Sequence, residues 1–132
     1  NGREDVLPKN ILPISHTTDQ RELANYYALA DLTILTSKRE TFSMVVAESL
    51  SCGTPVVGFK AGGPETIAIP EYSSFTENGN LELLKGKVED FLKKNINREE
   101  ISKQAHSIYS KKKMVNEYME IYKNLMVDEN QL

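Results

Sequence analysis

Two short apolar runs on either side of a short helical pattern constrain the fold of this chain more than any other feature. The runs are DLTILTS at residues 31–37 and TPVVGF at residues 54–59. Both are rich in β-branched residues and nearly free of charge, as expected of strands buried on both faces of a sheet. Between them, SMVVAESLSCG (residues 43–53) has the length of a short helix, and Gly53 stands where a left-handed cap is needed. Strand, helix and strand at this spacing predict a right-handed crossover and a parallel sheet.

The segment before this unit extends the alternation of strands and helices. NILPIS, at residues 10–15, is a short apolar run interrupted by Pro13, and we predict an edge strand there. Thr18 or Asp19 is then a candidate N-cap for a helix whose apolar residues recur at helical spacing: Leu23, Tyr26, Tyr27 and Ala30. The predicted fold class is therefore α/β, a Rossmann-like parallel sheet flanked by helices.

After residue 79 the pattern becomes helical. Three amphipathic helices are indicated by Leu81, Leu84, Val88, Phe91 and Leu92, by Ile101, Ala105, Ile108 and Tyr109, and by Met114, Tyr118, Ile121, Tyr122 and Leu125. We expect one domain over residues 1–132, with an α/β core at 10–79 and a helical part at 80–132. The lysines at residues 93–94 and 111–113 are either a patch for an anionic membrane or, as we favour, part of a solvated helix surface.

Composition excludes several classes of function. The net charge of −3 argues against nucleic acid as the main partner, because phosphate neutralisation needs a basic face. Cys52 is the single cysteine, which rules out an intrachain disulfide framework; we expect it to be a small buried residue at a helix end rather than a nucleophile. With His16 and His106 far apart in sequence, we expect no metal site. No apolar run approaches the roughly 20 residues that span a bilayer, and no signal peptide opens the chain, so we expect a cytoplasmic protein.

Two loops leave the carboxyl ends of the predicted strands, where ligands bind in open parallel sheets. One is SKRETFS and the other is KAGGPE, and both lead straight into helices. The first N–H groups of a helix have no intrahelical acceptor and suit an anion. The residues that would form such a cradle are Ser43 as an N-cap with the amides of Met44 and Val45, and Gly62, Gly63 and Pro64. The pattern predicts a phosphate-bearing ligand.

Two glutamates, Glu40 and Glu48, bracket a run that is otherwise small or apolar. Glu40 lies in the loop, and Glu48 lies about one and a half turns into the predicted helix. A carboxylate at that depth is unfavourable unless it is hydrogen-bonded, and the vicinal hydroxyls of a sugar are suitable donors. In the alternative, Glu40 caps the helix or pairs with Arg39, and Glu48 points to solvent. Spacing alone leaves both interpretations open.

Read as a whole, ETFSMVVAESLSCGTPVV followed by GGPE resembles the signature of retaining glycosyltransferases of the GT-B fold, in particular glycosyltransferase family 4. Members of that family carry two glutamates separated by seven residues, then small–x–x–Gly–Thr–Pro–Val–Val and a Gly–x–Pro–Glu loop. The resemblance runs from about residue 11 to residue 59, and less tightly to residue 65. MVNEYMEIYKNLM is also similar to the family's closing helix. The chain then looks like a partial C-terminal domain of such an enzyme.

The resemblance implies a role for each matching residue. Glu40 matches the glutamate that contacts hydroxyls of the donor sugar near the reacting centre, which makes it the candidate catalytic residue. Glu48 matches the glutamate that holds the ribose hydroxyls of the nucleotide. Ser15 and His16 fall on the loop that lies against the nucleobase, although a plain loop histidine is the alternative for His16. The implied donor-binding set is Thr41, Phe42, Ser43, Met44, Glu48, Gly62 and Gly63.

The sequence departs from the family pattern in two ways. The family usually has glycine at the position of Ser43, so a side chain here would narrow the donor pocket. The family's domain begins with a strand and a basic loop that neutralises the leaving diphosphate, and these would precede Asn1. Arg3 and Lys9 are the only candidates in NGREDVLPKN, which also lacks an initiator Met. We therefore expect a piece of a longer protein that is inactive without its N-terminal acceptor-binding domain.

The expected function is to hold the donor while a hexose or aminohexose moves, with retention, from a UDP- or GDP-sugar to a glycan or lipid-linked acceptor. The family needs no essential metal, and we expect no cofactor. The capsule-like SKRETFSMVVAES indicates bacterial surface polysaccharide, made in the cytoplasm or at the inner face of the membrane. One alternative is a nucleotide-sugar epimerase of the same fold, which needs a histidine facing the sugar, and only His16 is placed for that. The other is a non-catalytic α/β interaction domain with both glutamates on its surface.

Overall fold

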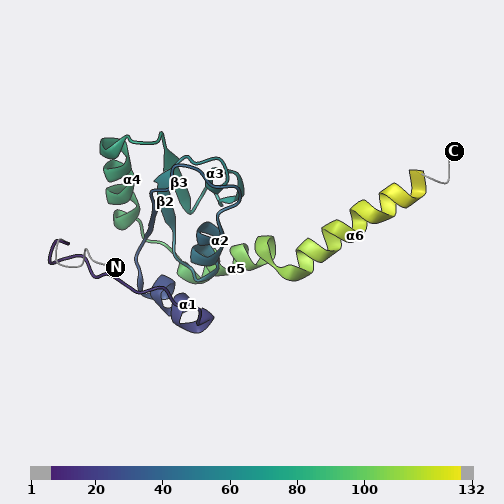
Figure 1. Ribbon diagram of the computed structural model, residues 1–132, viewed down its shortest axis with the longest axis horizontal. Helices are drawn as coiled ribbons and strands as arrows, with labels where there is room; N and C mark the ends of the chain where they lie inside the picture. The colour runs from purple at the N-terminus through teal and green to yellow at the C-terminus, as the bar shows by residue number, and fades with distance from the viewer. Residues whose placement is uncertain (1–6, 129–132) are drawn as a thin grey trace.

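A three-stranded parallel sheet lies between helices in the computed structural model, which describes residues 7–128 (Figure 1). The strands are β1 (Thr33–Leu35), β2 (Val56–Phe59) and β3 (Ser73–Thr76), in the order β1-β2-β3. The helices are α1 (Gln20–Leu29), α2 (Met44–Ser51), α3 (Pro64–Ile67), α4 (Leu81–Lys93), α5 (Arg98–Tyr109) and α6 (Lys111–Asp128). The predicted Rossmann-like α/β class is confirmed.

The core lies on both faces of the central strand, β2, whose four residues are all buried as predicted. Successive side chains of a strand alternate between its faces. Val56 therefore packs with α2 and α5, and Val57 and Phe59 pack with α4 on the other face. The first cluster comprises Leu35, Val46, Leu50, Val56, Ile69, Tyr72, Ile101 and Ala105, and the second comprises Val57, Phe59, Leu84 and Phe91.

Two strand predictions were wrong. β1 is not buried on both faces, because Leu35 is buried but Ile34, whose side chain lies on the other face, is 51% exposed. Residues 10–15 form no strand, and their side chains are exposed. A turn in which the amide of Ile11 bonds to the carbonyl of Pro8 (2.9 Å) leads into this segment, and Pro13 has no N–H to donate to a neighbour.

The predicted caps position the helices around the sheet. Asp19 caps α1, and its carboxylate accepts hydrogen bonds from the amides of Arg21 (2.8 Å) and Glu22 (3.4 Å). Gly53 has a φ of 79° after α2, and the amide of Thr54 bonds to the carbonyl of Ser49 at 2.9 Å. This is the left-handed ending that the sequence predicted, and it turns the chain directly into β2.

The last helix, α6, forms over the predicted residues but projects away from the rest of the molecule (Figure 1). The side chains of its expected apolar face are 51–59% exposed: Met114, Tyr118, Ile121, Tyr122 and Leu125. Its amphipathic pattern therefore predicted the helix but not a packing partner within the described residues. Among residues 7–128, no helix has the length and apolar character needed to span a bilayer.

Candidate functional site

The two loops that leave β1 and β2 are joined to each other. Glu40 and Gly62 form an isolated parallel bridge, in which the amide of Glu40 donates to the carbonyl of Ala61 at 2.9 Å. The carbonyl of Glu40 accepts from the amide of Gly63 at 3.0 Å. Because β1 and β2 are parallel neighbours, both loops lie at the same edge of the sheet. The structure thus brings Glu40 together with the glycine loop, as the sequence predicted.

Gly63 allows this close approach of the two loops. A Cβ atom at this position would lie 2.6 Å from the carbonyl carbon and oxygen of Thr41 and 2.7 Å from the amide nitrogen of Phe42. Any side chain would force the backbones apart. The space that the missing side chain leaves is therefore filled by the first loop.

The amides of the glycine loop are already occupied, which changes the predicted cradle. The carboxylate of Glu65 accepts from the amides of Ala61 and Gly62, both at 3.0 Å. Partial burial raises the pKa of Glu65, but these hydrogen bonds outweigh it and the net pKa lies below its ordinary value. The sequence carried a signal for this role, since a glutamate in the first turn of a helix often bonds back to preceding amides. The prediction that the amides of this loop are unpaired was therefore wrong, and the donor-binding role of Gly62 and Gly63 stays a prediction.

Ser43 does not cap α2 as predicted. Its backbone is left-handed, with φ 73° and ψ 80°, whereas a capping side chain needs an extended backbone to reach the helix amides. Its side chain makes no capping hydrogen bond, and Oγ is buried without a hydrogen-bond partner among residues 7–128. The amides of Met44 and Val45 at the start of α2 consequently bond to no acceptor among the described residues, whereas that of Val46 bonds to the carbonyl of Ser43 at 3.2 Å. They remain the part of the predicted cradle that can bind an anion.

Glu40 stands beside this helix start with a free carboxylate. The side chain is half-buried and makes no hydrogen bond or ion pair within the described residues, so it neither caps α2 nor pairs with Arg39. Around it, Thr41 is exposed, Phe42 is 47% exposed and Met44 is 59% exposed. The loop and the start of α2 therefore present a carboxylate, an aromatic ring and a thioether next to the amides of Met44 and Val45.

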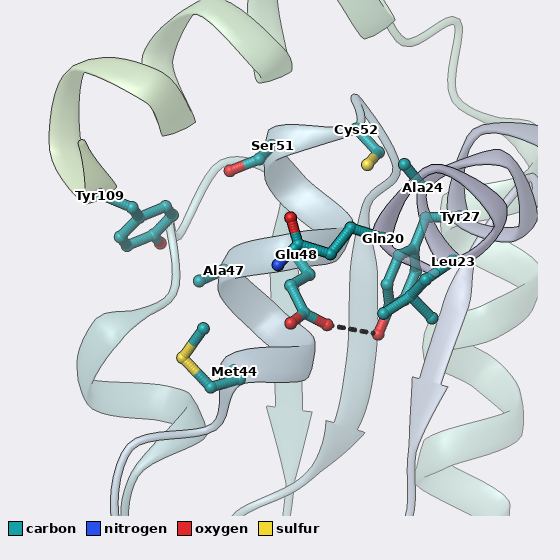
Figure 2. Close-up of a pocket in the computed structure, with 10 residues that line it drawn as sticks. All are labelled: Gln20, Leu23, Ala24, Tyr27, Met44, Ala47, Glu48, Ser51, Cys52 and Tyr109. Carbon is teal, nitrogen blue, oxygen red and sulfur yellow. Dashed lines mark hydrogen bonds between the residues drawn. The ribbon is translucent and has the colours of Figure 1, made fainter. Parts of the chain in front are cut away.

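Glu48 lines a cavity of about 350 Å³ between α1 and α2 (Figure 2). Its Oε2 accepts a hydrogen bond from the hydroxyl of Tyr27 at 3.1 Å, and the residue is half-buried rather than directed freely into solvent. Cys52 lies at the same cavity and is half-buried, where we expected full burial. Burial and the charge of Glu48 raise the pKa of the Cys52 thiol, which keeps it protonated and a poor nucleophile. The lining residues are Gln20, Leu23, Ala24, Tyr27, Met44, Ala47, Glu48, Ser51, Cys52 and Tyr109.

The remaining predicted residues lie elsewhere. Ser15 and His16 are exposed and line a different cavity of about 380 Å³, with Glu22 of α1. Lys9 is exposed, and Arg3 lies outside the described residues. Within residues 7–128, no three His, Cys, Asp or Glu side chains are grouped to hold a metal ion. The absence of a metal requirement stays a prediction.

Comparison with proteins of known sequence assigns this chain to a family. The family model described as "Glycosyl transferases group 1" matches residues 6–108. N-acetyl-alpha-D-glucosaminyl L-malate synthase of Bacillus anthracis is 29% identical over 115 residues, which cover 83% of this chain and 30% of that protein. D-inositol 3-phosphate glycosyltransferase of Xylanimonas cellulosilytica is 36% identical over 62 residues, which cover 47% of this chain and 15% of that protein.

Solved structures agree with this placement. HepE of Anabaena in complex with UDP is similar with a TM-score of 0.55 and 26% identity, over 77% of this chain and 29% of that chain. The complex of HepE with UDP-glucose gives the same TM-score at 25% identity. The chain thus spans 15–30% of the length of these relatives. Because the family model covers both glutamates and both loops, the chain belongs to the glycosyl transferases group 1 family, as its resemblance to the GT-B signature predicted.

Proposed function

We propose that this chain is the donor-binding part of a glycosyltransferase that moves a sugar from a UDP- or GDP-sugar to a glycan or lipid-linked acceptor, with retention of anomeric configuration. One observation carries the proposal. The free carboxylate of Glu40 is held at the joined carboxyl ends of β1 and β2, beside the unpaired amides that begin α2. Two similar proteins support the proposal. The protein of Xylanimonas cellulosilytica is a D-inositol 3-phosphate glycosyltransferase, and HepE was solved in complex with UDP and with UDP-glucose.

Each part of the site takes one part of the donor. Glu40 accepts hydrogen bonds from sugar hydroxyls and fixes the orientation of the donor, as the catalytic residue. The amides of Met44 and Val45 and the dipole of α2 stabilise the negative charge that develops on the leaving nucleoside diphosphate. Glu48 accepts from the ribose hydroxyls. Thr41, Phe42, Ser43, Gly62 and Gly63 shape the sugar and diphosphate pocket, and Ser15 and His16 face the nucleobase.

Other parts of the whole protein complete this half-site. An N-terminal domain holds the acceptor, and basic side chains outside the described residues balance the diphosphate charge. The reaction needs no metal or other cofactor in this proposal. The product is a bacterial surface polysaccharide, assembled in the cytoplasm or at the inner face of the membrane.

The test uses the full-length protein and a panel of UDP- and GDP-sugars. We expect Glu40→Ala to lower the transfer rate by about a hundredfold, with the product configuration read by NMR. Glu71→Gln is the matched control, because Glu71 is an exposed glutamate outside the site. Unchanged transfer by Glu40→Ala would refute the proposed role of Glu40. If the full-length protein binds no nucleotide at millimolar concentration, the interaction-domain alternative is favoured instead.

No observation favours the epimerase. That reaction needs a histidine facing the sugar, and His16 lines a cavity separate from the one at Glu48. His106 lies on α5, where its Nδ1 is 2.8 Å from the carbonyl oxygen of Ser102, one turn earlier on the same helix.

A further inference from the structure

Tyr27 connects α1 to the carboxylate of Glu48. Its hydroxyl lies 3.1 Å from Oε2 of Glu48, and both side chains face the same cavity (Figure 2). Helical spacing in the sequence gave Tyr27 only a packing role, yet no residue of α1 is fully buried.

The direction of this hydrogen bond is fixed. Burial, the charge of Glu48 and the hydrogen bond itself raise the pKa of Tyr27 to about 12. The phenol stays protonated at any physiological pH and donates to the carboxylate. Glu48 consequently has one oxygen held from the side of α1.

The backbone of Tyr27 is also held in place. Its carbonyl oxygen accepts from the hydroxyl of Thr54 at 2.6 Å, and Arg98 donates to that same hydroxyl oxygen at 2.7 Å. These contacts fix the end of α1 against the start of β2 and of α5. Tyr27 is thus a rigid point from which its hydroxyl can orient a neighbour.

The other oxygen of Glu48, Oε1, makes no hydrogen bond in the part of the chain that the structure describes. It is the acceptor left for a ligand hydroxyl. Resting on the proposed function, we infer that Tyr27 is a positioning residue that holds Oε2 of Glu48 so that Oε1 meets the ribose hydroxyls of the donor nucleotide. The hydroxyl of Tyr27 then strengthens ribose binding without touching the ligand.

The ratio of affinities for a ribonucleotide and for its dideoxy analogue, called ribose discrimination below, distinguishes a positioning role of Tyr27 from a purely structural one. The full-length protein is titrated by calorimetry with UDP and with its 2′,3′-dideoxy analogue, and with the matching GDP pair. Tyr27→Phe keeps the ring and removes the hydroxyl. We expect it to weaken binding of the ribonucleotide roughly fivefold and to leave binding of the dideoxy analogue unchanged. A ratio of affinities measured on one preparation is insensitive to any loss of folded protein.

Two further variants test whether Tyr27→Phe lowers ribose discrimination by acting through Glu48. In Glu48→Gln the discrimination should fall, and adding Tyr27→Phe to that variant should have no further effect. Tyr26→Phe is the matched control, because it removes a hydroxyl from the same helix that bonds to Glu22 instead, at 2.9 Å. We expect it to keep the wild-type ratio.

The possible failures are distinct. If Glu48→Gln loses discrimination but Tyr27→Phe keeps it, the inference about Tyr27 is wrong and the proposed function stands. If Glu48→Gln itself keeps the wild-type ratio, the ribose role of Glu48 is wrong and the inference falls with it. If the wild-type protein binds neither nucleotide, the proposed function is wrong as well.

Discussion

Arg98 and Thr54 meet at 2.7 Å, where Nη2 of Arg98 donates to Oγ1 of Thr54. The same nitrogen lies 2.8 Å from the carbonyl oxygen of Ala28 and 2.9 Å from that of Ala30, at the end of α1. The end of α1, the start of β2 and the start of α5 are far apart in sequence and are joined here by polar contacts. Because α1 has no fully buried residue, we expect the stability of its position against the domain to depend on these contacts.

Replacing Arg98 tests whether the position of α1 depends on these contacts. Arg98→Lys keeps the charge, but its shorter side chain withdraws the nitrogen that reaches the three oxygens, so we expect a loss of about 2 kcal/mol in the free energy of unfolding. Urea unfolding measures it, and hydrogen exchange in α1 should rise. Arg21→Lys, at an exposed position on α1, should change neither quantity. Equal stability of the two variants would show that α1 does not depend on Arg98.

Local signals explain what the sequence predicted well. The β-branched run of β2 and the glycine after α2 specify their conformations almost alone. Arg98 and Thr54, by contrast, are 44 positions apart, and an arginine at the start of a helix reads as a solvated charge. Long-range polar contacts of this kind leave no periodic pattern in a sequence.

The errors have the same origin. An apolar side chain such as Ile34 predicts burial only if a neighbour covers it, and periodicity cannot say whether one does. Serine is a common N-cap, but the backbone conformation of Ser43 is set by the loop contacts that surround it. For the site, spacing correctly placed Glu40 in a loop and Glu48 within a helix, but it left the roles of both glutamates open. The bonds of Glu65 to the glycine loop are local, and a glutamate in the first turn of a helix signals them, whereas the contact of Tyr27 with Glu48, 21 positions away, required the three-dimensional structure.

The contact between the two loops predicts the effect of a side chain at Gly63. Gly63→Ala would place a methyl group 2.6 Å from the backbone of Thr41. We expect a loss of about 2 kcal/mol in the free energy of unfolding, together with weaker nucleotide binding in the full-length protein. Gly86→Ala is the control, since nothing lies within 4 Å of its Cβ in α4 and alanine favours a helix. A Gly63→Ala protein as stable as the Gly86→Ala protein would contradict the tight joining of the loops.

We expect the contribution of Glu65 to the free energy of unfolding to fall at acid pH. Burial alone would raise its pKa, but the hydrogen bonds from the amides of Ala61 and Gly62 lower it below the ordinary value of 4.5. A lowered pKa adds stability above the unfolded-state value, and that stability is lost as pH falls through the folded-state value. Glu65→Gln should therefore cost about 1 kcal/mol at pH 7, and the difference from wild type should shrink below pH 4.5. Thermal unfolding across pH measures this, with Glu71→Gln as an exposed control; a difference that stays constant down to pH 3 would exclude the mechanism.

We expect a substitution at Ser43, a proposed donor-binding residue, to stabilise the folded protein. Its φ of 73° is strained for a residue with a Cβ, and its buried hydroxyl has no hydrogen-bond partner in the described part of the chain. Ser43→Gly removes both penalties and adds backbone entropy to the unfolded chain, so we expect a net gain of about 1 kcal/mol in stability. Ser43→Ala removes only the unpaired hydroxyl and keeps the left-handed backbone under strain, so its gain should be smaller. Melting temperatures of the two variants decide this, because a Ser43→Gly protein that melts below Ser43→Ala would mean that the left-handed backbone is not the source of strain. If the serine narrows the donor pocket, the glycine variant should also bind the nucleotide-sugar at least as tightly as wild type.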